Sequence, residues 1–460
     1  MALIKSISGI RGTIGGKPGE SLSPLDVVKY AAAFGQWAIS EGNKKIVVGR
    51  DGRISGPAVA EMVIQTLIAI GAEVIDLGLS TTPTVEFEVV AEKAAGGIII
   101  TASHNPKEWN ALKLLNSSGE FISAEIGAAI LNVAETENIL FASIEKTGKR
   151  ILRNEHANAH LDAIVNHPMV NAKIIANGKP KIIIDAINST GAIFVPDLLK
   201  KLGIPDQNII VLNSEVNGKF AHNPEPLPQH LTELSAAVVS HKADLGIAVD
   251  PDVDRLVLVC EDGSMFGEEY TLVAVADYIL GKSKGNTVSN LSSTKALKDV
   301  TEKHGGQYFA SAVGEVNVVT KMKEVNAVIG GEGNGGIIVP DFHYGRDALI
   351  GIALFLTHLC SSAKTAKQLR SGYPNYFISK NKIELEQGTD LSKVFDELKE
   401  KYKSYSINTT DGLRIDFDND WVHLRASNTE PIIRIIAESN FETTATNIAN
   451  KMIRDIQEIL

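Results

Sequence analysis

Lys181-Ile182-Ile183-Ile184-Asp185 is the stretch of sequence from which the fold can be inferred. A short apolar run bounded by polar residues predicts a buried strand. An amphipathic stretch follows from about Thr190 and stops at Gly203, where a glycine is typical of a helix end. The segment therefore predicts a strand, a turn and a helix in succession.

The same pattern occurs twice more, after the strand-like segments 45–49 and 286–290. Later in each of the three units a second apolar strand runs into an unusual loop. Alternating buried strands and helices predict parallel or mixed α/β sheets. Ligands of such sheets bind beyond the carboxyl ends of the strands, so we expect the three loops to face a common cleft.

The two ends of the chain depart from this pattern. An N-terminal arm carries Ser8-Gly9-Ile10-Arg11-Gly12, followed by a helix capped by Ser23 with Pro24 at its first position. Near the other end, 382–385 and 413–417 alternate as half-exposed strands do, and helical stretches accompany them. We predict three similar mixed α/β domains and a C-terminal α+β domain around a central cleft. Their predicted ranges are 1–150, 151–257, 258–371 and 372–460.

Composition excludes several classes of protein. The 460 residues include 45 Lys+Arg and 55 Asp+Glu, a formal charge of −10, which argues against nucleic-acid or membrane binding. The two cysteines, Cys260 and Cys360, are too few and too far apart for a disulfide-rich secreted scaffold. With no evident signal peptide or membrane span, we expect a cytoplasmic protein.

The first unusual loop, Thr101-Ala102-Ser103-His104-Asn105-Pro106, places a serine directly after buried strand residues. A serine on a tight turn is suited to act as a nucleophile. An ordinary strand-to-helix turn would explain the same residues. The adjacent His104 does not indicate a hydrolase triad, because members of a triad meet through the fold.

The second loop is Asp250-Pro251-Asp252-Val253-Asp254-Arg255. Its carboxylates converge if the backbone curls, and their repulsion then requires a cation such as Mg²⁺. An EF-hand is rejected, because Arg255 stands where that loop needs glycine and the flanking segments are strand-like. A solvated acidic turn is the remaining alternative.

The third loop, 330–336, contains a G-x-G-x-x-G pattern that would bind a dinucleotide only if a helix followed. Ile337-Ile338-Val339-Pro340 is instead an apolar stretch, so this reading is rejected. Glu332 and Asn334 offer hydrogen-bonding groups suited to sugar hydroxyls. A glycine-rich turn without a ligand is the alternative.

A fourth segment, 425–431, reads Arg-Ala-Ser-Asn-Thr-Glu-Pro. An arginine beside hydroxyl, amide and backbone donors favours a phosphate. A surface turn with an incidental arginine would also fit.

Together the four loops resemble those of the α-D-phosphohexomutase family, over essentially the whole chain. The matching strings are T-A-S-H-N-P, D-x-D-x-D-R, G-E-G-N-G-G and R-x-S-N-T-E-P. The resemblance implies a Mg²⁺-dependent phosphosugar mutase. Such an enzyme interconverts hexose 6- and 1-phosphates through a phosphoserine and a sugar 1,6-bisphosphate, which also serves as activator.

The resemblance also implies roles for individual residues. Ser103 would carry the phosphoryl group and complete a Mg²⁺ site with Asp250, Asp252 and Asp254; Arg11 and Arg255 would surround the phosphate; Lys113 would assist proton transfer; His104 would position the reacting groups; Glu332 and Asn334 would contact sugar hydroxyls; and Arg425, Ser427, Asn428 and Thr429 would bind the non-reacting phosphate. The bisphosphate must turn end over end, which a hinged fourth domain would permit.

Three positions differ from forms common in the family. Asn334-Gly335-Gly336 stands in place of Ser-Gly-His, and Asn110-Ala111 in place of Asn-Gly. Glu315 occupies a position where some relatives have His or Asp, and its carboxylate could pair with the amino group of glucosamine phosphate. Glucosamine phosphate is therefore the first expectation, with glucose or mannose phosphate as the alternative.

Two other functions remain open on the sequence. The chain could bind sugar phosphates without turnover, or it could be a Mg²⁺-dependent phosphatase that loses the phosphoryl group to water. Retention of Ser103, the three aspartates and Lys113 favours catalysis over mere binding. We expect hexose phosphates as the partners, with neither nucleic acid nor membrane, and a monomer or homodimer.

Overall fold

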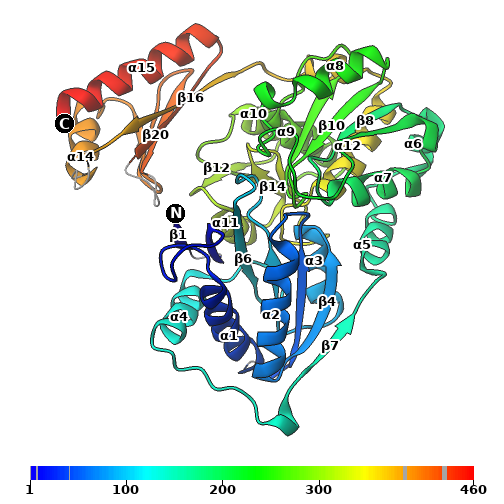
Figure 1. Ribbon diagram of the computed structural model, residues 1–460. Coiled ribbons are helices and arrows are strands. Elements are labelled where there is room, and N and C mark those ends of the chain that lie inside the picture. The colour runs from blue at the N-terminus through cyan, green and yellow to red at the C-terminus, as the bar shows by residue number, and fades with distance from the viewer. Residues whose placement is uncertain (1, 7–8, 41, 387–390, 427–431) are drawn as a thin grey trace. The chain divides into compact units, whose positions relative to one another are not determined.

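The computed structural model describes residues 2–6, 9–40, 42–386, 391–426 and 432–460 (Figure 1). They form two compact units. Unit 1 comprises Met1–Ile279 and Asn334–Arg370, and unit 2 comprises Leu280–Gly333 and Ser371–Leu460. The predicted architecture of three α/β sheets and a C-terminal α+β domain is confirmed. The predicted domain boundaries after residues 150, 257 and 371 stay predictions.

The first sheet of unit 1 has the strand order β1-β2-β6-β5-β3-β4-β7. Its strands are β1 (Leu3–Ser6), β2 (Gly9–Thr13), β3 (Lys45–Arg50), β4 (Glu73–Leu79), β5 (Gly96–Ile100), β6 (Trp109–Leu115) and β7 (Lys149–Leu152). β3 is parallel to β4 and β5, whereas β6 is antiparallel to β5 and β2. The sheet is therefore mixed, and the carboxyl ends of β3 and β5 lie at one edge.

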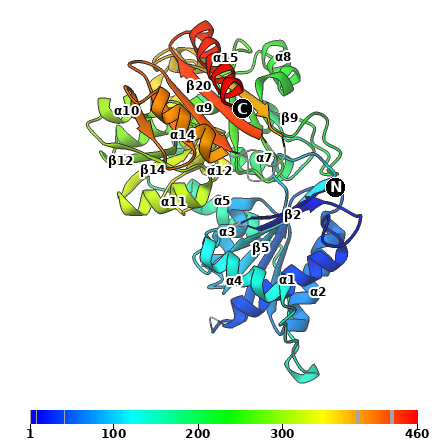
Figure 2. The same ribbon diagram turned by 90° about the vertical axis from the view of Figure 1, so that its left-hand side faces the viewer.

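Helices cover both faces of this sheet. They are α1 (Pro24–Ser40), α2 (Gly56–Ile70), α3 (Thr82–Ala91) and α4 (Ala124–Glu135). Ile46 and Val48 belong to the core formed with α1, α2 and α4, whereas Val47 between them packs with α3. Figure 2 shows β5 between α3 on one side and α1 and α2 on the other. Successive strand residues point to opposite faces, which explains why the strands are apolar throughout.

The predicted helix ends are confirmed. The Ser23 backbone N–H donates to Asp26 Oδ2 at 3.1 Å, and the Asp26 N–H lies 3.4 Å from Ser23 Oγ, so the two residues cap α1 reciprocally. α2 ends at Gly71, whose φ of +103° only glycine adopts without strain.

The second sheet of unit 1 has the order β11-β10-β8-β9. β10 is parallel to β8 and antiparallel to β11. The strands are β8 (Ile182–Asp185), β9 (Ile209–Leu212), β10 (Leu245–Val249) and β11 (Leu256–Cys260). The helices around them are α5 (His156–Val165), α6 (Ala172–Gly178), α7 (Gly191–Lys201), α8 (Thr232–Ser240), α9 (Glu268–Leu280), α12 (Ala348–Ser362) and α13 (Ala366–Arg370), with short 3₁₀ turns at Asp206–Asn208 and Pro228–His230. A further 3₁₀ turn, Ile144–Lys146, precedes β7 of the first sheet. Strands on both sides of the acidic loop rule out an EF-hand, as predicted.

In unit 2, β12 lies between β13 and β14, and all three are parallel. The elements are β12 (Asn286–Asn290), α10 (Ala296–Lys303), β13 (Tyr308–Ser311), α11 (Glu315–Glu324) and β14 (Ala327–Glu332). After the glycine-rich loop the chain continues in unit 1 as strand β15 (Gly336–Ile338). A strand rather than a helix confirms that the glycine pattern is not a dinucleotide motif.

The C-terminal part of unit 2 is an antiparallel sheet of order β16-β20-β19-β18-β17. Its elements are β16 (Phe377–Glu384), α14 (Leu391–Lys401), β17 (Ser406–Asn408), β18 (Leu413–Asp416), β19 (Trp421–Ala426), β20 (Ile432–Ser439) and α15 (Glu442–Ile459). Leu398 of α14 and Met452 of α15 share a core with Val422 and Ile433 of the sheet. Within the described ranges, no helix combines the length and apolarity needed to span a membrane.

Candidate active site

Ser103 sits in a strained turn at the carboxyl end of β5. Its φ is +48°, in the left-handed region, and its side chain is buried. The Ser103 N–H donates to Thr101 Oγ1 at 3.0 Å, and the Asn105 N–H donates to the Ala102 carbonyl. Left-handed backbone at a residue other than glycine persists only where surrounding contacts enforce it, and it is concentrated at functional sites.

Arg53 enforces this turn. Its guanidinium donates to four carbonyl oxygens, of Ser103 (2.5 Å), Asn105 (2.6 Å), Pro106 (2.7 Å) and Trp109 (3.0 Å), and its Nε lies 3.0 Å from Asp51 Oδ2. Arg53 is 1% exposed. We did not predict its role, although Asp51-Gly52-Arg53 directly follows β3, a position that marks candidates in a parallel sheet.

Asp51 also stabilises the serine turn, through contacts with Thr101 and Arg53. It accepts a hydrogen bond from Thr101 Oγ1 at 2.7 Å as well as pairing with Arg53. Burial raises its pKa to about 6, although the Arg53 charge opposes the shift. The pair thus ties the end of β3 to the serine turn.

The acidic loop after β10 curls as predicted. Val253, a β-branched residue, has φ +61°, and its N–H donates to the Asp250 carbonyl at 3.1 Å. The hydroxyls of Ser189 and Thr190 donate to the Pro251 carbonyl at 2.5 and 2.9 Å. One carboxylate oxygen from each of the three aspartates, Asp250, Asp252 and Asp254, lies within 4.8 Å of the other two.

The structure brings the serine turn and the acidic loop together. Ser103 Oγ donates to Asp250 Oδ2 at 2.6 Å, although the two residues are 147 positions apart. Burial raises the pKa of Asp250, and the charges of Asp254 and Asp252 raise it further. Such mutual repulsion is typical of carboxylates arranged to share a cation.

The carboxylate oxygens fit a bound cation. Asp252 Oδ1 and Asp254 Oδ1 are buried and have no hydrogen-bond partner among the described residues. Their other oxygens are occupied: Asp252 Oδ2 accepts from Thr82 Oγ1 at 2.6 Å, and Asp254 Oδ2 accepts from Arg346 Nη2 at 2.7 Å. A hard dication such as Mg²⁺ would satisfy the two remaining oxygens.

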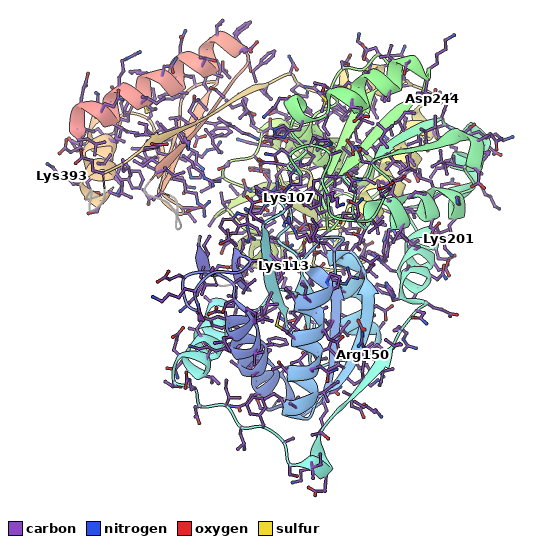
Figure 3. All side chains as sticks on the ribbon, viewed as in Figure 1. Lys107, Lys113, Arg150, Lys201, Asp244 and Lys393 are labelled. Atoms are coloured by element: carbon purple, nitrogen blue, oxygen red, sulfur yellow. The ribbon has the colours of Figure 1, made fainter. Side chains whose placement is uncertain are left out.

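Lys113, labelled in Figure 3, projects from β6 to the same carboxylates. Its Nζ lies 2.7 Å from Asp252 Oδ2 and 3.3 Å from Asp254 Oδ2. Burial alone would lower the pKa of Lys113, but the two carboxylates outweigh it and raise the pKa above its ordinary value. The two carboxylates therefore favour the ammonium form of Lys113.

Two arginines lie around the serine turn. Arg11 on β2 donates from Nη1 to Asn105 Oδ1 at 2.8 Å. The Arg255 N–H donates to Asp250 Oδ1 at 3.2 Å, and its buried Nε has no hydrogen-bond partner among the described residues. A donor buried without a partner is costly, and a phosphate oxygen would satisfy it.

His104 lies beside the serine, with Nδ1 3.3 Å from Ser103 Oγ. Burial lowers the pKa of His104 well below its ordinary value, and the charges of Arg255 and Arg11 add to the shift. The ring is therefore neutral, which agrees with a positioning role.

Arg346 is a further charged residue that the sequence analysis missed. A Cβ atom at Gly336 would lie 2.4 Å from Arg346 Cδ, so the arginine stem occupies the space next to this glycine. Burial would raise the pKa of Asp254, but Arg346, followed by Lys113 and Arg255, holds it below its ordinary value. The available signal was Gly336 itself, because a glycine leaves room for a neighbouring side chain.

The predicted sugar-binding residues are divided between the units. Asn334, in unit 1, accepts from the Gly336 N–H at 3.2 Å through Oδ1. Glu332, in unit 2, accepts from Asn290 Nδ2 at 2.8 Å and from the Gly314 N–H at 3.0 Å through Oε1. Glu315 is buried at the start of α11, directly after Gly314. Glu332 thus contacts the backbone of the residue that precedes Glu315.

The predicted phosphate loop is described only in part. Arg425 pairs through Nε with Asp411, 3.0 Å from Oδ2. Ser427, Asn428 and Thr429 lie outside the described residues. The phosphate-binding role of this loop stays a prediction.

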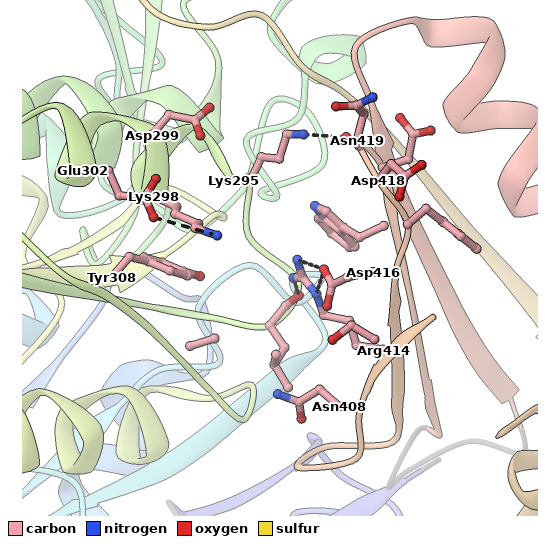
Figure 4. Close-up of a pocket in the computed structure, with 16 residues that line it drawn as sticks. Lys295, Lys298, Asp299, Glu302, Tyr308, Asn408, Arg414, Asp416, Asp418 and Asn419 are labelled. Carbon is pink, nitrogen blue, oxygen red and sulfur yellow. Dashed lines mark hydrogen bonds and ion pairs between the residues drawn. The ribbon is translucent and has the colours of Figure 1, made fainter. Parts of the chain in front are cut away.

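Unit 2 also contains a cavity of about 490 Å³ between α10 and the β18–β19 hairpin (Figure 4). Its lining includes Lys298 and Tyr308 on one side and Arg414, Asp416 and Trp421 on the other. Arg414 Nη2 is paired with Asp416 Oδ1 at 2.8 Å. None of the predicted site residues within the described ranges lines this cavity.

The site combines a serine, hydrogen-bonded to a carboxylate cluster, with a lysine and arginines at the carboxyl ends of strands in α/β sheets. This combination defines a phosphoryl-transfer enzyme. Four family models agree with this class. They are described as phosphoglucomutase/phosphomannomutase α/β/α domains I, II and III and C-terminal domain, and they match residues 3–139, 158–263, 267–376 and 382–455.

Individual relatives extend over the whole chain. A "Phosphoglucomutase/phosphomannomutase" of Thermococcus kodakarensis is 34% identical over 98% of both chains. A "Probable phosphoglucosamine mutase" of Methanopyrus kandleri is 31% identical over 97% of this chain and 96% of its own. A solved structure of a phosphoglucomutase/phosphomannomutase family protein from Burkholderia thailandensis has a TM-score of 0.85 at 25% identity, covering 99% of this chain and 97% of that one. The chain belongs to the phosphoglucomutase/phosphomannomutase family of phosphohexomutases.

Proposed function

We propose that this protein interconverts hexose 6-phosphates and hexose 1-phosphates through a phosphoserine at Ser103, with glucosamine phosphate as the preferred substrate. The observation that carries the proposal is the 2.6 Å hydrogen bond from Ser103 Oγ to Asp250, within a cluster whose carboxylates have oxygens left for a cation. Binding alone would need no transferable phosphoryl group beside a metal site.

Each transfer breaks one P–O bond and forms another. The phosphoryl group leaves Ser103 Oγ for a free sugar hydroxyl, and the proton of that hydroxyl ends on Ser103 Oγ. The bisphosphate then turns, and its other phosphoryl group returns to the serine. Arg11 and Arg255 would bind the transferring group, and Lys113 would relay the proton: its ammonium would protonate the serine oxygen, and the resulting amine would take the proton of the attacking hydroxyl.

Mg²⁺, held by Asp250, Asp252, Asp254 and a phosphoserine oxygen, would neutralise charge on the transferring group.

A variant of Thr82 tests the metal site, because the Thr82 hydroxyl donates to Asp252 Oδ2 at 2.6 Å and so orients that carboxylate. In Thr82→Val, which keeps the shape of the side chain, the Mg²⁺ concentration for half-maximal activity should rise about 10- to 100-fold, because partners that orient metal ligands tune affinity. Activity titrated with MgCl₂ measures it.

Thr136→Val is the matched control. Thr136 is exposed, and its hydroxyl donates to the Asn132 carbonyl far from the carboxylates. Equal Mg²⁺ requirements in both variants would contradict the proposed metal site.

Glu332 and Asn334 would bind the sugar hydroxyls, while Arg425, Ser427, Asn428 and Thr429 would hold the non-reacting phosphate. The preference for glucosamine rests on Glu315, whose buried carboxylate would pair with the substrate ammonium. Several relatives are named phosphoglucosamine mutases, including that of Methanopyrus kandleri, which supports this choice. The name of the Thermococcus kodakarensis relative favours glucose or mannose phosphate as the second candidate.

A competition assay tests both substrate and reaction. Glucosamine, glucose and mannose 6-phosphates are mixed with enzyme, MgCl₂ and a trace of sugar bisphosphate, and each 1-phosphate is followed by phosphorus NMR. We expect the highest kcat/KM for glucosamine 6-phosphate and negligible free phosphate. Phosphate release matching isomerisation would indicate a phosphatase instead.

In the same assay, Glu315→Gln should reduce the preference for glucosamine over glucose about tenfold, because the amide cannot pair with an ammonium as a carboxylate does. Glu324→Gln, at the exposed end of α11, is the matched control and should leave the ratio unchanged. An unchanged ratio in Glu315→Gln would remove the argument for glucosamine without affecting the proposed mutase reaction.

A further inference from the structure

A second cluster of side chains that could hold a metal ion lies in unit 1, separate from the three aspartates. His160 Nε2 and His343 Nε2 each lie 3.1 Å from Asp347 Oδ2. One donor atom from each of these three residues lies within 4.8 Å of the other two. His160 and Asp347 are almost completely buried, and the His343 side chain is 11% exposed.

Two segments far apart in the sequence contribute to this cluster. His160 comes from α5, and Asp347 is the N-cap residue of α12, with His343 just before it. Asp347 Oδ1 accepts from the Leu349 N–H at 2.7 Å and the Ile350 N–H at 3.2 Å, so capping occupies one carboxylate oxygen. The other oxygen, Oδ2, faces both histidines.

The far ring nitrogens of the two histidines face groups that orient metal-bound imidazoles in other proteins. His160 Nδ1 lies 2.9 Å from Thr84 Oγ1, and His343 Nδ1 lies 3.5 Å from Glu86 Oε2, both on α3. The Thr84 hydroxyl can hold the proton of the His160 ring at Nδ1 and leave the lone pair of Nε2 for a metal. His343 Nδ1 makes no hydrogen bond to a described residue, although the Glu86 carboxylate lies near it.

Aromatic packing fixes the orientation of the His160 ring. It stacks on Phe87 with a centroid separation of 5.1 Å, and on Phe342 at 5.6 Å. A ring fixed before binding costs less conformational entropy when a metal binds.

The charge of the cluster also favours a cation. Glu86 and Asp347 place two carboxylates in a buried region beside the two imidazoles. A divalent ion would neutralise both, and two imidazoles with one carboxylate are ligands of transition metals such as zinc rather than magnesium.

We propose that His160, His343 and Asp347 form a second metal site, selective for a divalent transition ion of the Zn²⁺ type. The ion would join α5, the start of α12 and, through Thr84 and Glu86, α3. Two residues that contact the aspartate cluster belong to the same segments: Thr82 begins α3, and Arg346 precedes Asp347. The site would thus be structural, holding Thr82 and Arg346 against Asp252 and Asp254. The proposal does not depend on the mutase reaction.

The test is a Co²⁺ titration of the full-length, metal-stripped protein in excess MgCl₂, followed by visible absorption. We expect one equivalent of Co²⁺ to give the intense bands of a four-coordinate site with nitrogen ligands, and Zn²⁺ to displace it. His343→Gln should weaken binding more than about 100-fold, because it removes a ligand. His241→Gln, an exposed histidine on the surface, should bind like the wild type.

Two further measurements separate this site from the alternatives. Asp252→Asn should retain the Co²⁺ bands, whereas their loss would assign the ion to the aspartate cluster and overturn the proposal. Crystals of the wild-type protein grown with Zn²⁺ should show an anomalous peak between His160, His343 and Asp347. No saturable bands and no peak would show that the cluster is only a hydrogen-bonded His–Asp–His network.

Discussion

Replacing Ser103 with alanine is expected to lower mutase turnover by at least about 10³-fold, because it removes the oxygen that accepts and returns the phosphoryl group. The fold should survive, since the backbone contacts of the turn depend on Arg53 and Thr101 rather than on the serine hydroxyl. The measurement pairs turnover by phosphorus NMR with the intact mass of the protein after incubation with a sugar bisphosphate. The wild type should gain one phosphoryl group and Ser103→Ala none.

Ser118→Ala is the control, an exposed serine in the next turn along the chain. It should keep full turnover and still gain the phosphoryl group. Phosphorylation of Ser103→Ala at wild-type level would show that another residue is the nucleophile and would refute the proposed reaction.

Replacing Arg53 with methionine is expected to lower the free energy of unfolding by about 3–5 kcal/mol and to abolish turnover. Methionine keeps the apolar stem but removes the buried guanidinium that donates to four carbonyl oxygens and pairs with the Asp51 carboxylate. The left-handed turn at Ser103 would lose the contacts that enforce it. Urea unfolding followed by circular dichroism measures the stability.

The effect of Arg53→Met should depend on pH. Asp51 has a raised pKa of about 6 because of burial, and losing Arg53 would raise it further. In the variant, Asp51 is protonated below its raised pKa, so no charge is buried there. Above that pKa its carboxylate is buried without the Arg53 charge to compensate it, which costs stability. The destabilisation relative to wild type should therefore be smaller at about pH 5 than at about pH 8.

Arg50→Met is the matched control, because Arg50 is the neighbouring arginine on β3 and donates one hydrogen bond, to the Asp51 carbonyl at 3.1 Å. Loss of this hydrogen bond should lower the free energy of unfolding by about 1 kcal/mol. If Arg53→Met were no more destabilising than Arg50→Met, or if its effect did not change with pH, the role assigned to the Arg53–Asp51 pair would be wrong.

Local sequence patterns were sufficient for most of the fold. The strand at 181–185, the capping of α1 by Ser23 and the end of α2 at Gly71 depend on hydrophobic periodicity and on the conformations of single residues. The same reasoning placed the serine and the aspartates at strand ends. These features depend on neighbours a few residues away, which a sequence displays directly.

Residues that act through distant contacts could not be found in this way. Thr82 contacts Asp252, 170 positions away, and Arg346 contacts Asp254, 92 positions away. Neither residue shares a sequence motif with its partner. Each meets its partner only because folding packs two sheets and a helix against one another. The proposed second metal site could not be predicted from the sequence for the same reason, because His160 and Asp347 are 187 positions apart.

By itself, the sequence determined the succession of strands and helices, the loops at the strand ends and the kinds of group those loops carry, because these depend on local backbone preferences and periodicity. Only the tertiary structure decided which oxygens of Asp252 and Asp254 are left for a cation, that Lys113 remains an ammonium, and that Arg53 supports the serine. Hydrogen-bond directions and pKa shifts arise from burial and from charges at distances of a few ångströms, and folding alone sets those distances between residues far apart in the chain.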